Sequence, residues 1–351
     1  MTYIAKPKFR HPKLPTNSHG LTHRDYEGVV STLCAGCGHD SISAAVIEAC
    51  FELDIEAHRI AKVSGIGCSA KTTNYFLGRS HGFNSVHGRM PSVATGANLA
   101  NRDLTYIGVS GDGDTASIGM GQFVHAVRRR LNMLYLVENN GTYGLTKGQS
   151  SATNDKASKN KKGLSTPFES IDLAAMAVEL GAGFVARSFS GDKAQLVPLM
   201  KAALRYRGFA LIDVISPCVT FNNPASSTKS YDYVREHNAA LDRVDFVSPE
   251  REITIEYEAG TTTEVTLHDG SELALHKLAP DYDPCDKGNV LATLQRMKAS
   301  GEIATGLLYL EKDESDLHDL IATTRRPLND LSYEDLCPES AALAAINASH
   351  S

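Results

Sequence analysis

The residues best suited to chemistry in this chain form an acidic glycine motif and an asparagine pair, Gly111-Asp112-Gly113-Asp114 and Asn139-Asn140. Each follows a short apolar run, so both are expected at the carboxyl ends of neighbouring strands, where open parallel sheets bind ligands. Asp112 offers a carboxylate oxygen, Asn140 offers an amide oxygen, and the glycines let the backbone approach a large polyanion. A carboxylate, a carbonyl-type oxygen and a diphosphate suit octahedral Mg²⁺. The pattern therefore predicts a clamp for a metal ion and a diphosphate.

A structural alternative stands beside this hypothesis. A glycine turn after a strand is common, so the acidic motif alone also fits a structural turn or a site for any nucleotide. Asn140 follows Asp112 by 28 residues and comes after a second apolar run, which favours the clamp.

The elements that must position this clamp are a strand over residues 104–109, a helix over 118–131 and a strand over 133–137. Similar alternation along the chain predicts an α/β fold, a doubly wound parallel sheet with helices on both faces. The other expected helices cover 41–53, 71–77, 93–102, 171–180, 193–205 and 288–300, and the other expected strands cover 61–64, 184–186 and 210–214.

Composition divides the chain into three predicted parts: an N-terminal arm over 1–28, the α/β domain over 29–225, and a C-terminal extension over 226–351. The extension is expected to hold a small β-meander over 251–278 and a helical or disordered tail from Glu334. The polar, lysine-rich residues 150–163 are interpreted as a solvated loop, with a mobile lid as the alternative.

The overall composition excludes several classes of function. The net charge of −6 gives no reason to expect nucleic acid or an anionic membrane as a partner. No apolar run of about 18 residues is present, and the first residues lack the apolar core of a signal peptide. We therefore expect a cytoplasmic protein.

Seven cysteines, an odd number in a long chain expected to be intracellular, do not indicate a disulfide framework. Cys34 and Cys37 form a CxxC pair, which alone fits a redox dithiol, half of a zinc site or part of an iron–sulfur site. Cys68 follows a glycine pair, and Cys218 follows a strand and a proline. Four cysteines from three segments make a [4Fe–4S] site plausible. Cys50 is expected in the core, whereas Cys285 and Cys337 are expected to be structural or free.

Several motifs in this order resemble the β subunit of 2-oxoacid:ferredoxin oxidoreductases, over about residues 28–225, and the run from Asn140 to Gln149 is most similar to the 2-oxoglutarate branch. The matching motifs are Cys34-Ala35-Gly36-Cys37-Gly38-His39, Gly65-Ile66-Gly67-Cys68-Ser69-Ala70-Lys71, His87-Gly88-Arg89, Gly111-Asp112-Gly113-Asp114, His125-Ala126-Val127-Arg128-Arg129, the run from Asn139 to Gln149, and Cys218 with Phe221-Asn222.

The resemblance implies a thiamine diphosphate (TPP) site with Mg²⁺ and one [4Fe–4S] cluster. It implies the cluster ligands Cys34, Cys37, Cys68 and Cys218, and the Mg²⁺ ligands Asp112, Asn140 and the carbonyl of Thr142. It also implies cofactor contacts from His39, Gly67, Gly111, Gly113 and Asp114. Lys71 and Lys147 match positions that face the reacting end of the cofactor, and an exposed loop lysine is the alternative for Lys147. Roles for His39, His87, Arg89 and His125 in acid–base chemistry are not assigned.

The same resemblance implies oxidative decarboxylation of 2-oxoglutarate with coenzyme A, giving succinyl-CoA and CO₂, with electrons passed through the cluster to ferredoxin. A separate α subunit is expected to supply most of the coenzyme A site and the glutamate that activates TPP, in an αβ or (αβ)₂ assembly. Three alternatives remain: the same chemistry on pyruvate or a branched 2-oxoacid, an electron-transfer subunit with a vestigial TPP site, and a decarboxylase subunit with structural zinc.

Overall fold

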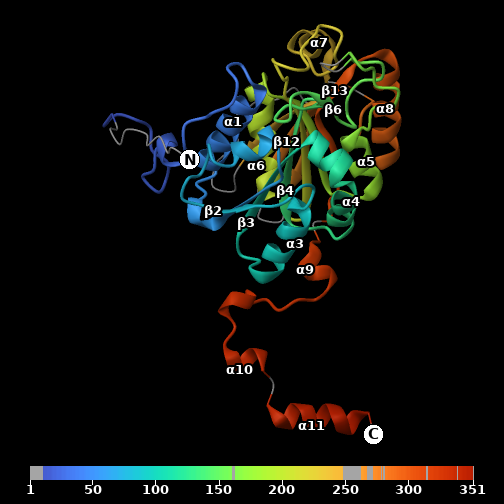
Figure 1. The fold of residues 1–351 in the computed structure, drawn as a ribbon. Helices are drawn as coiled ribbons and strands as arrows, with labels where there is room; N and C mark the ends of the chain where they lie inside the picture. Colours follow the sequence, from blue (N-terminus) through green and yellow to red (C-terminus); the bar gives the residue numbers. More distant parts are fainter. Residues whose placement is uncertain are drawn as a thin grey trace.

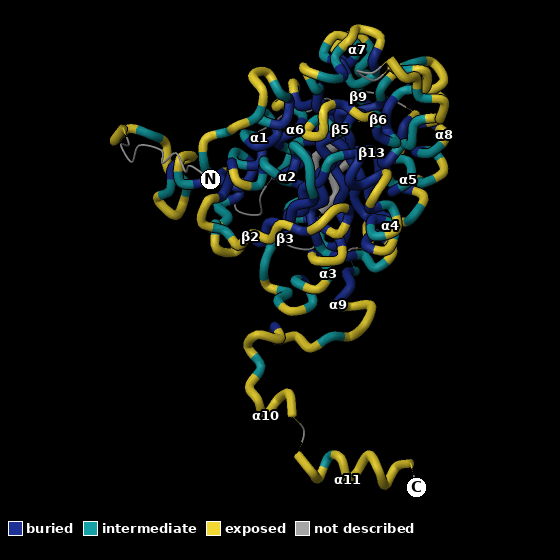
Figure 2. Tube along the Cα trace, in the orientation of Figure 1, coloured by how far each residue is buried: buried dark blue, intermediate teal, exposed yellow. Residues whose placement is uncertain are grey.

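In the computed structural model of the chain, the described residues are 11–159, 163–247, 262–266, 272–277, 279, 281–313, 315–337 and 339–350. Figure 1 shows a central sheet between two layers of helices, with the C-terminal segment extending away from this body. Figure 2 shows that the buried residues gather in the sheet and on the helix faces that cover it. None of the helices in the described ranges is long and apolar enough to cross a membrane.

The central sheet has eight strands in the order β2-β1-β3-β4-β8-β7-β13-β9. The first six are parallel, β13 runs antiparallel to β7, and β9 runs parallel to β13. A mostly parallel sheet places the carboxyl ends of its strands at one edge, as the sequence predicted. In sheet order the strands are His81–Asn84, Ile60–Ser64, Thr105–Gly111, Met133–Asn139, Phe209–Ile215, Phe184–Phe189, Ile303–Leu310 and Asn238–Ala240.

Helices cover both faces of the sheet, because side chains alternate between the two faces along each strand. Ile107 of β3 packs in the core on one side of the sheet, and its neighbour Tyr106 packs in the core on the other. The first side is covered by α1 (Gly38–Glu52) and α6 (Lys193–Arg205). The second side is covered by α3 (Met90–Ala100), α4 (Met120–Arg128), α5 (Leu173–Leu180) and α8 (Lys287–Ser300).

Two of the expected helices differ from the structure. The helix expected over 71–77 is α2, Cys68–Thr72, and the chain then turns. The side chain of Lys62 explains the early end, because its Nζ donates to the carbonyls of Thr73, Phe76 and Leu77, which a continuing helix would use. The helix expected over 118–131 is split into a π-helical turn, Asp114–Ile118, and the shorter α4.

The C-terminal part of the chain contributes to two sheets. A small antiparallel sheet contains β10 (Asp242–Val247), β11 (Thr262–Thr266) and β12 (Glu272–Lys277), in the order β10-β12-β11. Within the expected meander, β11 and β12 pair antiparallel. Its residues 251–261, 267–271 and 278 lie outside the described residues. β13 was not expected from the sequence, and it joins the main sheet beside β7. The division at 225/226 stays a prediction.

The remaining C-terminal helices are short. They are α7 (Tyr231–His237), α9 (Leu317–Leu320), α10 (Tyr333–Leu336) and α11 (Ser340–Ser349). The described part of the tail from Glu334 contains α10 and α11, so the helical alternative is the one observed, and neither helix buries a side chain.

A buried carboxyl group at the start of β10 predicts a pH dependence of stability. Asp242 accepts a hydrogen bond from the Leu307 backbone N–H at 2.9 Å, and burial raises its pKa to about 7. The unfolded carboxyl has a pKa of about 3.9, so the folded state binds the proton more tightly between these values. The contribution of Asp242 to the free energy of unfolding is therefore largest below about pH 4 and is lost as the pH rises through 7.

We expect Asp242→Asn to raise the melting temperature relative to the unsubstituted chain at pH 8 and to change it little near pH 4, measured by calorimetry. The amide keeps an acceptor for Leu307 and carries no charge. Asp103→Asn, at an exposed carboxylate, serves as the control. A melting temperature for Asp242→Asn below that of the unsubstituted chain at pH 8 would contradict the expectation.

Candidate cofactor and metal site

A cavity of about 470 Å³ lies at the carboxyl edge of β1, β3 and β4. Its walls come from the turns that follow these three strands and from α2. The lining residues are His39, Ile66, Gly67, Cys68, Ser69, Ala70, Lys71, Asn74, Asn84, His87, Gly111, Asp112, Gly113, Asp114, Glu138, Asn140, Thr142, Tyr143, Gly144, Leu145 and Thr146. Both motifs of the predicted clamp therefore line the same cavity.

Asp112 is the buried acid of this cavity, with only 1% of its surface exposed. One carboxylate oxygen accepts from the Asn140 backbone N–H at 3.2 Å, and the other accepts from Thr153 Oγ1 at 2.5 Å and from Ser151 Oγ. Burial raises the pKa of Asp112, whereas these hydrogen bonds lower it, and the net direction is upward. A bound cation would stabilise the ionised form further.

The structure brings the three expected Mg²⁺ ligands together. Asn140 bonds to Asp112 through its backbone, and its Oδ1 accepts from the Thr142 N–H at 3.0 Å. The donor set of one carboxylate, one amide oxygen and one main-chain carbonyl suits Mg²⁺, which prefers oxygen ligands and retains waters and phosphate oxygens.

Sequence reasoning missed Ser151 and Thr153, which lie in the segment interpreted as a solvated loop. Both are buried, because β5 (Thr142–Tyr143) and β6 (Gln149–Ser150) form a hairpin that returns the chain to Asp112. The solvated-loop prediction is therefore wrong for 151–154. It holds for the exposed Lys156 and Lys159, while 160–162 lie outside the described residues. A hydroxyl-rich run soon after a predicted metal ligand was the available signal.

A glycine is required at the mouth of the clamp. A Cβ at Gly113 would lie 2.5 Å from Tyr143 Cε1, and the Tyr143 hydroxyl donates to the Gly113 carbonyl at 2.9 Å. The turn after β3 is thus packed directly against the β5–β6 hairpin. This contact leaves the backbone beside Asp112 without a side chain, as a diphosphate cradle requires.

Asp114 lines the cavity, but its carboxylate is engaged by protein donors. It accepts from the Gly88 N–H at 2.7 Å, from the Ile66 N–H at 3.1 Å and from Ser110 Oγ at 3.0 Å. Asp114 therefore ties the loops after β1 and β2 to the turn after β3.

His39 and Glu138 form a buried polar pair in the cavity wall. His39 Nε2 lies 3.7 Å from a Glu138 carboxylate oxygen and 3.5 Å from Asn140 Nδ2, and its Nδ1 lies 2.5 Å from Ser216 Oγ. Burial lowers the pKa of His39 to about 4 and raises the pKa of Glu138 well above its ordinary value. The lowered pKa leaves His39 neutral near pH 7, so its close approach to Glu138 is not an ion pair.

The two predicted lysines lie in different surroundings. Lys71 lines the cavity, and its Nζ donates to the Thr32 carbonyl at 3.1 Å. Lys147 is exposed on the β5–β6 hairpin and is not part of the cavity lining. The role of Lys147 stays a prediction.

The other residues of the matching motifs divide between the cavity and the surface. Gly67 lines the cavity at the start of α2 with a positive φ of 91°. His87 lines the cavity from an exposed position. Arg89 and His125 are exposed, so the packing role considered for His125 is not observed.

The structure gathers the four predicted cluster cysteines beside the same cavity. A Cβ at Gly144 would lie 3.4 Å from Cys68 Sγ and 3.6 Å from Cys218 Sγ. The Cys37 N–H donates to the Cys34 carbonyl at 3.0 Å, and Thr220 Oγ1 lies 3.7 Å from Cys34 Sγ. Burial raises the pKa of Cys37 to about 12, with further raising by Glu138, Cys218 and Cys68, which places this thiol among them.

All seven cysteines are free thiols. Cys50 is fully buried in the core, as expected. Within the described ranges, no three His, Cys, Asp or Glu side chains are placed to hold a single metal ion. A four-iron cluster differs, because each thiolate binds a separate iron and the sulfurs surround the cluster instead of converging on one point. Four neighbouring soft sulfur donors therefore suit the chemistry of such a cluster.

Gly144 offers a test of the space between these thiols. We expect Gly144→Ala to lower the iron content of the purified protein, because the added methyl group occupies space between Cys68 and Cys218. Iron is measured chemically and by visible absorption. Gly96→Ala is the control, because a Cβ there meets nothing within 4 Å. Unchanged iron content in Gly144→Ala would argue against a cluster at this position.

Comparison with known proteins identifies the family. Residues 65–214 match the family described as "Thiamine pyrophosphate enzyme, C-terminal TPP binding domain". The chain is 34% identical over 225 residues to the 2-oxoglutarate synthase subunit KorB of Methanocaldococcus jannaschii, covering 62% of this chain and 82% of that protein. The chain belongs to the β subunits of the 2-oxoacid:ferredoxin oxidoreductases.

Other members of this β-subunit family agree with that assignment. The chain is 42% identical over 192 residues to the 2-oxoacid:ferredoxin oxidoreductase subunit beta of Sulfolobus sp, covering 54% of this chain. It spans 63% of the length of that relative, which is less than two thirds.

A solved structure supports the fold over nearly the whole β-subunit chain. The 2-oxoglutarate:ferredoxin oxidoreductase from Magnetococcus marinus, with 2-oxoglutarate, coenzyme A and succinyl-CoA bound, has a TM-score of 0.74 and 28% identity. The match covers 95% of this chain and 97% of that chain. The fold class expected from the sequence is therefore confirmed.

Proposed function

We propose that this β subunit forms half of the active site of a 2-oxoacid:ferredoxin oxidoreductase that uses TPP, Mg²⁺ and one [4Fe–4S] cluster. One observation carries the proposal: the hairpin that follows Asn140 also contacts the cysteine group. Gly144, four residues after Asn140, lies against Cys68 and Cys218. The oxygen clamp and the thiols therefore share one wall, so the two groups would lie close together.

Each group has a candidate set of residues in this chain. Mg²⁺ would be held by Asp112, Asn140 and the Thr142 carbonyl. The diphosphate would lie against the backbone of the lining glycines Gly67, Gly111 and Gly113. The cluster would be held by Cys34, Cys37, Cys68 and Cys218. When bound, TPP stabilises negative charge at the reacting carbon, and the cluster accepts electrons one at a time.

The protein groups around the reacting end would exclude water and orient the substrate. His39 and Glu138 are buried in this wall, and burial disfavours the charged form of each side chain. Lys71 is the cation in the cavity lining, and its ammonium would attract a carboxylate of the substrate.

The proposed substrate is 2-oxoglutarate, converted with coenzyme A to succinyl-CoA and CO₂ with transfer of electrons to ferredoxin. Two comparisons favour this branch. The M. jannaschii relative is a 2-oxoglutarate synthase subunit, and the M. marinus enzyme has 2-oxoglutarate and succinyl-CoA bound. The residues give no preference between this direction and reductive carboxylation.

A separate α subunit is proposed to cover the mouth of the cavity. Several exposed apolar side chains lie on the segments that line this cavity or next to them, and a partner subunit would cover such side chains. Phe83 and Val86 flank the lining residue Asn84, Ile118 lies beside Gly88, and Leu145 lines the cavity itself. The α subunit would also supply the glutamate that activates TPP and most of the coenzyme A site, in an αβ or (αβ)₂ assembly.

Substrate choice can be tested with the co-expressed α and β subunits. We expect reduction of ferredoxin or a viologen dye to depend on coenzyme A and to be fastest with 2-oxoglutarate among pyruvate, branched 2-oxoacids and 2-oxoglutarate. Faster reduction with pyruvate would move the proposal to that substrate. Absence of reduction with every 2-oxoacid, in a complex that contains iron and TPP, would overturn it.

The metal clamp can be separated from the cluster. We expect Asp112→Ala to abolish TPP binding, measured by calorimetry, while the visible absorption and about four iron atoms per β chain remain. Asp103→Ala, at an exposed carboxylate, is the control. Unchanged TPP affinity in Asp112→Ala would exclude the clamp, and stoichiometric zinc in place of iron would exclude the electron-transfer half of the proposal.

A further inference from the structure

A hydrogen-bond network of buried side chains leads away from Asp112 to Asp213 and Arg187, which no motif indicated. Thr153 Oγ1, which bonds to Asp112, lies 3.1 Å from Asn139 Oδ1. Asn139 Nδ2 donates to Asp213 Oδ1 at 2.9 Å, and Arg187 Nε donates to Asp213 Oδ2 at 3.2 Å. All of these side chains are buried. This hydrogen-bond network therefore crosses from the turn after β3 through β4 and β8 to β7.

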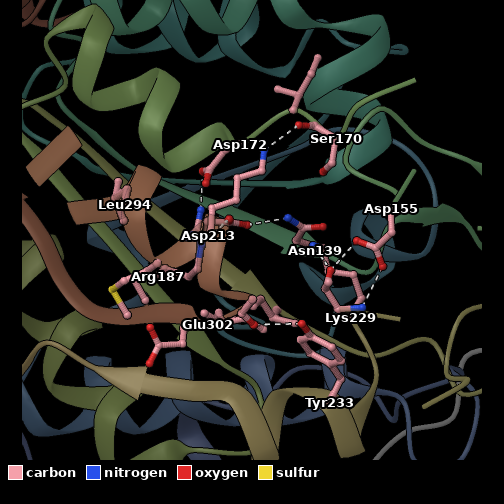
Figure 3. A pocket seen from close by; sticks show the side chains of 18 of the residues that line it. Asn139, Asp155, Ser170, Asp172, Arg187, Asp213, Lys229, Tyr233, Leu294 and Glu302 are labelled. Carbon is pink, nitrogen blue, oxygen red and sulfur yellow. Dashed lines mark hydrogen bonds and ion pairs between the residues drawn. The ribbon is translucent and has the colours of Figure 1, made fainter. Parts of the chain in front are cut away.

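The hydrogen-bond network ends at the N-terminus of helix α5. Arg187 Nη2 donates to Asp172 Oδ1, and the same oxygen caps α5 by accepting from the Ala175 N–H at 3.0 Å. Figure 3 shows Asn139, Asp213, Arg187 and Asp172 in the wall of a second cavity, of about 340 Å³. Arg187 and Asp213 are directly paired residues of adjacent parallel strands, so the sheet itself fixes their separation.

We propose that Asn139, Asp213 and Arg187 are positioning residues that orient Thr153 and thereby hold the Asp112 carboxylate in the geometry required for metal binding. This inference rests on the proposed function. It assigns a role to three side chains that lie outside the metal-ligand and cofactor-contact sets.

The orientation of the Asn139 amide is the central step. Asp213 accepts from Nδ2, so a flipped amide would direct its oxygen at a carboxylate oxygen and its nitrogen at the Thr153 hydroxyl. Asp213 therefore keeps Asn139 Oδ1 facing Thr153. The hydroxyl of Thr153 has one proton, and its shorter contact, 2.5 Å, is to Asp112. Asn139 Oδ1, at 3.1 Å, is a second acceptor for the same proton, so the two acceptors together fix the direction in which the Thr153 hydroxyl points.

Arg187 keeps Asp213 in place as an acceptor. Burial lowers the pKa of Arg187, but Asp172 and Asp213 raise it well above its ordinary value. Burial raises the pKa of Asp172, whereas Arg187 and the Ala175 N–H lower it, with a net lowering. The arginine and Asp172 are therefore ionised, and charge-assisted hydrogen bonds of this kind are strong and directional.

The test measures binding of Mn²⁺ with TPP to the complete αβ complex, by electron paramagnetic resonance of the free ion. Asn139→Ala and Thr153→Val are each expected to weaken metal affinity by about 10-fold to 100-fold, the usual effect of losing a partner of a metal ligand. Because Asn139 acts through Thr153, the double variant is expected to have the same metal affinity as whichever single variant binds the metal less tightly. Thr153→Ser, which retains the hydroxyl, is expected to restore most of the affinity.

A matched ion pair at the other edge of the sheet gives the control. Arg207 Nε donates to Asp316 Oδ2 at 3.2 Å near the amino end of β8. Arg207 Nη2 donates to a second carboxylate, that of Asp319, in the same way that Arg187 donates to both Asp213 and Asp172. Asp316→Asn is expected to lower the melting temperature of the metal-free complex without changing metal affinity. Melting temperatures of every metal-free variant separate loss of stability from loss of binding.

The outcomes distinguish this inference from the proposed function. If the unsubstituted complex binds no Mn²⁺ with TPP, the proposed function fails. If it binds and Asn139→Ala binds equally well, or if the effects of Asn139→Ala and Thr153→Val multiply, the positioning role is overturned. Should Asn139→Ala fail to fold, Arg187→Lys, which retains the charge and alters the direction of the donors, is expected to weaken metal affinity, and equal affinity overturns the inference.

Discussion

The structure depends on keeping the Asp112 carboxylate buried beside the cavity at the carboxyl edge of the sheet. A buried charge is costly unless it is paired and hydrogen-bonded. Here the Asn140 backbone, Ser151 and Thr153 supply those bonds, and they come from a segment that leaves β4 and returns through the β5–β6 hairpin. The need to satisfy one acid thus explains why this hairpin closes over the turn after β3.

The same hairpin couples the two halves of the proposed site. The residues on either side of it, Asn140, Ser151 and Thr153, bond to the acid. Gly144 at its tip lies against the sulfurs of Cys68 and Cys218. A displacement of the hairpin would therefore alter the oxygen clamp and the thiol group together. The hairpin would therefore hold the proposed organic cofactor and the proposed cluster next to each other.

Much of this arrangement was predictable from the sequence, because strands and the polar residues that end them carry local signals. The apolar runs before Asp112 and Asn140 predicted β3 and β4, and the four cysteines stood out by their glycine and proline neighbours. Other features depend on contacts distant in the chain. Lys62 ends α2 through three carbonyls. The strand β13 pairs with β7, which lies far earlier in the chain. Thr153 and Arg187 gain their roles only once the sheet is assembled.

The most direct test of the central claim is anomalous X-ray diffraction from anaerobic crystals of the αβ complex, prepared with TPP and with Mn²⁺ in place of Mg²⁺. Data at the manganese and iron edges locate both metals in one crystal. The account predicts a manganese peak between Asp112 and Asn140, and an iron peak surrounded by Cys34, Cys37, Cys68 and Cys218. Manganese bound away from Asp112, or iron absent from the four cysteines in active crystals, would contradict it.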